Sequence, residues 1–191
     1  MNKPETSIAQ DVVSAGLVTH RAATEQVGAG GVYTVECVAP DGTVKWTDTF
    51  LNLVMNEGVQ YMNTQTFKGA AYTAAWYLGL VTGPGSGTTF AAGDTLVTHA
   101  GWTENTAYAG SRKAVTFGTA TTANPSVISN SASPASFVMN ATATIAGAFL
   151  ANVSSGTSGV LFSAGDFTGG DKFVDSGDTL NVTYTFSLTA T

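Results

Sequence analysis

The stretch DTLNVTYTFSLT, residues 178–189, indicates the fold most directly. Apolar side chains at Leu180, Val182, Tyr184, Phe186 and Leu188 alternate along it with asparagine, threonine and serine. Successive side chains of a β-strand point to opposite faces of a sheet, so this alternation predicts a strand with one buried face. The other face carries neutral hydroxyl and amide groups and no charge.

Further strand-like runs precede this stretch, separated by clusters of glycine, asparagine, proline and serine. The runs at 32–39 and 43–50 flank Pro40-Asp41-Gly42, a sequence that favours a turn, and so predict a β-hairpin. The others lie at 74–81, 113–118, 136–141, 142–153 and 159–165. About seven to nine short strands with this spacing predict a mainly β fold, a β-sandwich of jelly-roll type. The immunoglobulin version is disfavoured because its paired cysteines are missing.

Two segments depart from the strand pattern. One short α-helix is predicted over about residues 53–66, with Asn52 as its N-cap and Gly58 weakening its interior. Residues 1–31 contain no aromatic side chain and end in Gly28-Ala-Gly-Gly31, a composition typical of a hinge. We therefore expect an extended N-terminal arm at 1–31 and a single β-sandwich domain at 32–191.

The predicted arm carries an apolar stripe at roughly helical spacing. Its members are Ile8, Val12, Ala15 and Val18, which recur at spacings of three or four residues. A stripe this narrow cannot bury itself. Two interpretations stay open: a frayed terminus, or an arm that becomes ordered on a neighbouring subunit.

Charge and compartment signals are few. Charged residues make up 10% of the 191 residues, and Lys and Arg number 7 against 13 Asp and Glu, a net charge of -6. An acidic chain repels phosphate backbones and anionic membranes, so we expect no nucleic-acid and no membrane partner. No apolar run suits a signal peptide or a membrane span. With Cys37 as the only cysteine, we expect synthesis in a reducing cytoplasm.

The uncharged strand faces favour an assembly protein. The chain contains 30 threonines, many at strand positions where free-standing proteins use lysine or glutamate. Charge is a main defence of sheet edges against pairing with other chains. A subunit of a larger assembly would tolerate or exploit such edges.

Catalytic and metal-binding patterns are weak. His99 lies near Asp94 and Glu104, but no nucleophile elbow accompanies it, so a loop-ordering role is expected. Glu57, Asp94 and Glu104 could be paired as glycosidase carboxylates in several ways, and the sequence offers no means of choosing. We expect no enzyme activity, no catalytic or metal-binding residues and no cofactor.

The acidic run over residues 166–178 is a candidate calcium-binding site. It contains Asp166, Asp171, Asp175 and Asp178, but lacks the spacing of an EF-hand and the repeat of a calcium β-roll. Aspartate beside glycine is also what turns require, and this interpretation is favoured, while calcium binding stays open.

Several other side chains are candidates for contact with a partner or for burial. Trp76 and Tyr77 fall in an apolar run and are expected in the core, and Cys37 is expected to be a small buried residue rather than a reactive thiol. Trp102 stands in a polar segment and is a candidate contact residue. Tyr108 and Arg112 join Trp102 as predicted partner-binding residues, together with five apolar residues of the arm: Ile8, Val12, Val13, Leu17 and Val18.

A set of short strings resembles a family of tailed-bacteriophage virion structural proteins. They are Trp46-Thr-Asp-Thr-Phe50 with Asn52-Leu53-Val54, Phe67-Lys-Gly, Ala71-Tyr72-Thr-Ala-Ala-Trp76-Tyr77-Leu78-Gly79-Leu80, Asp94-Thr-Leu96, His99-Ala-Gly-Trp102-Thr-Glu104, Tyr108, Arg112, Asn130-Ser-Ala, Gly165-Asp-Phe167 and Ser176-Gly-Asp178-Thr-Leu180-Asn-Val182. The similarity covers roughly residues 44–188, and the arm lies outside it.

The resemblance implies a non-enzymatic component of the particle, a capsid decoration (cement) protein on the outside of a phage head. Its expected partners are the major capsid protein and copies of itself, with a trimer as the working expectation for a closed oligomer. Its expected place is the capsid surface, after synthesis in the bacterial host. The alternative is a tail, fibre or head–tail junction component that contacts host glycans through Trp102 or the loop at 82–93.

Overall fold

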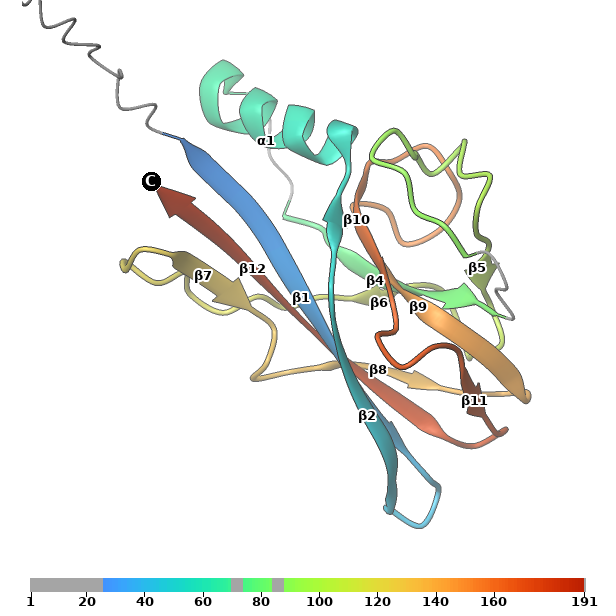
Figure 1. Ribbon diagram of the computed structural model, residues 1–191. Helices are drawn as coiled ribbons and strands as arrows, with labels where there is room; N and C mark the ends of the chain where they lie inside the picture. Colours follow the sequence, from blue (N-terminus) through green and yellow to red (C-terminus); the bar gives the residue numbers. More distant parts are fainter. Residues whose placement is uncertain (1–25, 70–73, 84–87, 191) are drawn as a thin grey trace, which may run out of the picture.

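The computed structural model describes residues 26–69, 74–83 and 88–190, and it confirms a mainly β fold (Figure 1). Two antiparallel sheets pack face to face with a largely apolar core between them. The predicted β-sandwich is therefore confirmed. The arm stripe predicted within residues 1–25 lies outside the described residues.

The first sheet contains both the earliest and the latest described strands. Its order is β2-β1-β12-β7, and β8 also pairs with β12. The strands are β1 (Val27–Val38), β2 (Val44–Leu51), β7 (Ser126–Ser129), β8 (Ala135–Val138) and β12 (Thr179–Ala190).

The second sheet has the order β3-β10-β9-β4-β5, with β11 paired to β9 and β6 paired to β4. Its strands are β3 (Leu53–Val54), β4 (Tyr77–Thr82), β5 (Glu104–Asn105), β6 (Lys113–Ala114), β9 (Ala143–Ala151), β10 (Leu161–Asp166) and β11 (Lys172–Val174). The chain passes between the sheets after β2, β6, β8 and β11. Each sheet thus combines strands that are distant in sequence.

The alternation in residues 178–189 appears as predicted in β12. Leu180, Val182 and Tyr184 are at most 1% exposed, because they face the second sheet. Burial then decreases toward the end of the strand, where Phe186 is half-buried and Leu188 is 38% exposed. The apolar face of β12 therefore extends past the closed part of the sandwich.

The glycine cluster Gly28–Gly31 is part of β1, so the hinge interpretation is wrong for these residues and the sandwich begins at Val27. They pair with β12 from Gly28↔Thr189 to Gly31↔Phe186, and this pairing fixes their extended backbone. Gly31 has a packing reason as well, because a Cβ there would lie 2.6 Å from the Tyr184 hydroxyl.

Buried hydroxyl groups connect the two sheets inside the core. The hydroxyl of Tyr33 in β1 lies 2.8 Å from Oγ of Ser163 in β10, and that Oγ donates to the Tyr184 hydroxyl at 3.3 Å. Asn52 Nδ2 donates to the same Tyr184 hydroxyl at 2.9 Å. Burial raises the pKa of both tyrosines, so they stay neutral. Cys37 is fully buried as predicted, and burial raises its thiol pKa to about 11.

The helix α1 (Asn56–Lys68) begins and ends a little later than predicted. Asn52 is not its N-cap, because its side chain instead accepts from Gly31 N at 2.6 Å and Leu53–Val54 pairs with β10. The N-cap residue is Met55, and the C-cap residue is Gly69, whose φ of 58° lies in the left-handed region. Gly58 is required for packing, since a Cβ there would lie 2.6 Å from the carbonyl oxygen of Phe162.

We predict that Gly58→Ala destabilises the protein, although alanine is more favourable than glycine inside a helix by about 1 kcal/mol. The added methyl group must push α1 away from β10, and overpacking of this kind costs about 1–3 kcal/mol. Urea unfolding followed by tryptophan fluorescence measures the difference. Gly30→Ala is the matched control, since a Cβ at Gly30 meets nothing within 4 Å. Equal stability of the two variants would contradict the prediction.

Candidate functional site

An apolar groove lies between α1 and the ends of β1 and β12. Figure 1 shows the helix beside the start of β1, with the end of β12 next to that strand. Val27 of β1, Leu188 of β12 and Phe67 of α1 line the groove, together with Trp76, and its volume is about 450 Å³. The remaining lining residues all belong to α1: Tyr61, Met62, Asn63, Gln65 and Thr66.

A second hollow continues the groove into the open end of the sandwich. The two share Met62 and Trp76, and the inner hollow has a volume of about 200 Å³. Its other lining residues come from both sheets and the segments between their strands: Phe117, Ile128, Leu150, Phe162, Tyr184 and Phe186. This continuity gives the groove a deep apolar floor.

Edge-to-face aromatic contacts hold the wall of the groove in place. The Trp76 ring lies 5.6 Å from the Tyr61 ring and 5.2 Å from the Phe162 ring, measured between centroids. The Phe162 ring in turn lies 5.3 Å from that of Phe186. All three pairs are close to perpendicular, the arrangement that aromatic quadrupoles favour. The wall is therefore a preformed surface.

The rim of the groove exposes large apolar side chains. Phe67 is 82% exposed and Val27 is 72% exposed, and both line the groove together with Leu188. Exposed apolar residues are ordinary when scattered, but a contiguous group of them marks an interaction surface. Gln65 adds a polar feature, since among the described residues its buried Oε1 has no hydrogen-bond partner. Because that oxygen has no exposed surface, the rim itself is mainly apolar and suits an apolar segment.

The strand edge beside the groove is open. β2 ends at Leu51 opposite Val32, so among the described strands none pairs with the outer edge of β1 from Val27 to Gly30. These four residues carry no charge. Uncharged edges of this kind accept an added strand from another chain. We name the groove and this edge together the docking surface and treat it as the candidate functional site.

Trp102 is not the exposed contact residue that the sequence suggested. It is 6% exposed, and its indole Nε1 donates to Asp94 Oδ2 at 3.1 Å. Its ring stacks on His99 at 4.1 Å between centroids and packs at 5.3 Å on Phe149 of β9. The loop before β5 folds back over the second sheet and buries the ring there. His99 orders this loop as expected, with Nδ1 at 2.9 Å from the Trp102 carbonyl oxygen.

Arg112 and Tyr108 are also buried, which contradicts their assignment to a contact surface. The Arg112 guanidinium donates to both carboxylate oxygens of Glu104, at 2.9 and 2.7 Å, and to the carbonyl oxygens of Val153 and Gly156. Arg112 therefore joins the segment that contains β5 to the loop after β9. Tyr108 is 3% exposed and its ring packs edge-on against another core ring at 4.8 Å.

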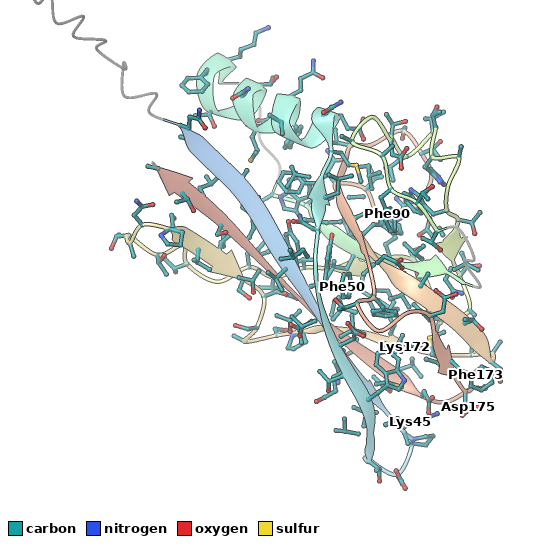
Figure 2. All side chains as sticks on the ribbon, in the orientation of Figure 1. Lys45, Phe50, Phe90, Lys172, Phe173 and Asp175 are labelled. Carbon is teal, nitrogen blue, oxygen red and sulfur yellow. The ribbon has the colours of Figure 1, made fainter. Side chains whose placement is uncertain are left out.

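The acidic run ends in ion pairs at the end of the sandwich away from α1. Lys45 Nζ lies 2.8 Å from Asp175 Oδ2 and 2.7 Å from Asp178 Oδ2. Figure 2 shows Lys45 and Asp175 together at this end, with Lys172 nearby. Lys172 pairs with Asp48 at 3.2 Å. Among the described residues, no group of three or more histidine, cysteine, aspartate or glutamate side chains could hold a metal ion.

The carboxylates considered for catalysis each have a different partner. Glu57 accepts from the backbone N–H of Leu161, Asp94 accepts from the Trp102 indole, and Glu104 pairs with Arg112. Burial raises the pKa of Glu57, and the Leu161 N–H opposes that shift. These partners give all three carboxylates a role in holding loops and the start of α1.

Comparisons with known proteins give no assignment: no family model, no curated protein and no solved structure matches this chain. Among the helices that the structure describes, none has the length and apolar character needed to cross a membrane.

Sequence reasoning misses the residues of the groove. Phe67, Phe186 and Leu188 are visible there only as apolar members of a helix and a strand, and Val27 falls within the predicted arm. Periodicity shows that a side chain lies on the apolar face of its element, but not whether another element covers that face.

We predict that Asp178→Asn flattens the acid side of the pH–stability curve. Burial raises the pKa of Asp178, but the hydrogen bonds from Lys45 and from the backbone N–H of Asp175 outweigh burial and hold it below its usual range. A lowered pKa stabilises the fold above the pKa of the unfolded chain, and this contribution is lost as the pH falls through the folded pKa.

The free energy of unfolding of Asp178→Asn should therefore lie below that of the wild type at pH 7, and the difference should shrink in acid. Urea unfolding between pH 7 and pH 3 measures both. Lys45→Met removes the partner of the ion pair and should flatten the curve in the same sense. A constant difference across this range would refute the role of the pair.

Proposed function

We propose that this chain is a non-enzymatic structural protein of a tailed-phage particle that decorates the outside of the capsid and stabilises contacts between major capsid subunits. The observation that carries the proposal is the docking surface: an apolar groove beside an uncharged, open strand edge at Val27–Gly30. A surface with both features serves to bind another protein segment.

Two further observations support an assembly role. The chain is poor in charge, at 10% of residues, and the outward positions of its strands are largely threonine, serine and asparagine. The strings at 44–188 resemble phage virion proteins. The carboxylates that could have served catalysis hold loops instead, which favours a structural protein over a hydrolase.

The test is the number of copies of this chain per purified parent particle, measured by quantitative mass spectrometry against the major capsid protein. Decoration requires a ratio between about one to one and one to three, because such subunits occupy or bridge symmetry-related positions over the whole shell. A ratio below about one to twenty would replace the proposal by a tail, fibre or head–tail junction component. Absence from the particle would refute both.

We predict that a chain lacking residues 1–25 folds normally but is lost from the particle. The deletion spares β1, which begins at Val27, so the sandwich should keep its melting temperature. The deleted segment carries the apolar stripe of Ile8 to Val18, and we expect retention on decoration-free capsids to fall more than tenfold, a loss of about 1.4 kcal/mol or more. Co-sedimentation measures it.

The matched control for this prediction is Val97→Ser. Val97 is 72% exposed and lies outside the docking surface, so its substitution should leave retention unchanged. Full retention of the shortened chain would show that the arm is not needed for attachment.

A further inference from the structure

We propose that the groove receives residues 8–18 from a second copy of this chain, so that neighbouring copies exchange their N-terminal segments. This rests on the proposed function and deepens it: the docking surface joins copies of the chain to one another on the shell, and removal of residues 1–25 weakens attachment because it breaks up the oligomer. It is tested on the purified chain without any particle, so the two proposals can fail separately.

The chemistry of the segment matches that of the groove. Residues 8–18 contain the apolar stripe and a single charged residue, Asp11. The groove is lined by Val27, Phe67, Leu188 and Trp76 and has no charged side chain in its lining. The hollow that adjoins it along α1 shares Phe67 and includes Lys68, the basic residue in the last turn of the helix.

Lys68 is therefore placed to pair with Asp11 when the stripe lies on the groove. The apolar side chains of the stripe would thus lie against an apolar floor, and Lys68 beside the groove offers an opposite charge to Asp11. Docking of an amphipathic segment into an apolar groove has this pattern.

The connection between the stripe and β1 favours a second copy over the same chain. Val27 is itself part of the groove, so a stripe that docked on its own groove would have to fold back within residues 19–26, before β1 begins. Residues 19–26 read THRAATEQ and contain no glycine, proline, asparagine or aspartate, the residues that make tight reversals. Eight extended residues span at most about 29 Å, enough to cross to a neighbouring copy.

The exchange of segments also gives a closed oligomer. The segment leaves each copy at Val27, beside the groove that accepts the segment of its neighbour. Two copies related by a two-fold axis, or a small ring, would satisfy every groove and every segment. The uncharged edge of β1 at Val27–Gly30 lies at the same place and would also be covered.

The experiment compares the size of four purified chains by light scattering after gel filtration, from about 1 to 100 μM. The full chain should be oligomeric, and the chain lacking residues 1–25 should be monomeric. Val12→Ser/Leu17→Ser alters the segment, and Phe67→Ser/Leu188→Ser alters the groove. Each double variant should raise the dissociation concentration at least tenfold while circular dichroism and the melting temperature stay close to those of the full chain.

Mixing the two double variants distinguishes exchange of segments between copies from docking of a segment on its own chain. The segment variant keeps an intact groove and the groove variant keeps an intact segment, so a mixture should form mixed oligomers that neither forms by itself. A synthetic peptide of residues 5–21 should bind to the chain lacking residues 1–25 in calorimetry, and binding should be lost when that chain also carries Phe67→Ser/Leu188→Ser. Val97→Ser is the control for removal of an exposed apolar side chain.

A monomeric full chain, or an unchanged oligomer after removal of residues 1–25, would overturn the proposal. Peptide binding combined with a monomeric full chain would also overturn it, since the segment would then occupy its own groove. If the exchange is found but the chain is absent from purified particles, the proposed function fails and the exchange stands.

Discussion

The twelve residues of β1 pair with the twelve residues of β12, from Val27↔Ala190 to Val38↔Thr179, and both the core and the docking surface depend on this ladder. It joins the first described strand to the last, so the first sheet is complete only when both ends of the chain are present. It also brings the rings of Tyr33 and Tyr184 to 4.7 Å between centroids. Their hydroxyls reach Ser163 in the second sheet, and a shift of one sheet against the other would leave these buried groups unpaired, at a cost of about 1–3 kcal/mol each.

The same ladder creates the docking surface. Because β2 stops opposite Val32, β1 and β12 continue past it as a pair with one open edge. Helix α1 reaches this end of the sandwich by lying close against β10 at Gly58, and it covers the apolar side chains there only in part. Val27, Phe67 and Leu188 remain exposed around an aromatic floor. A longer β2 would have closed the open edge and removed one half of the surface.

The two ends of the sandwich differ in chemistry. Away from α1, the carboxylates of Asp175 and Asp178 enclose Lys45, and Asp48 pairs with Lys172, so the charges of that end are largely satisfied within the chain. At the α1 end the exposed groups that line the groove are apolar or neutral, and Lys68 lies in the hollow beside it. This asymmetry favours attachment through the α1 end, where residues 1–25 also join the fold. An assembly subunit with one such end fits the proposed role on a particle surface.

Local sequence was sufficient to predict the strands in which buried and exposed side chains alternate. The alternation in β12 predicted the burial of Leu180, Val182 and Tyr184, and Pro40-Asp41-Gly42 predicted a turn in which Gly42 has a φ of 87°. The tertiary structure decided the rest, because the deciding partners are distant in the chain. Trp102 stands among polar neighbours but is buried against Phe149, and Gly31 belongs to a strand because β12 pairs with it and Tyr184 needs its space. The groove has the same origin: each of its apolar residues is visible in the sequence, but only the packing of three distant elements leaves them uncovered on one surface.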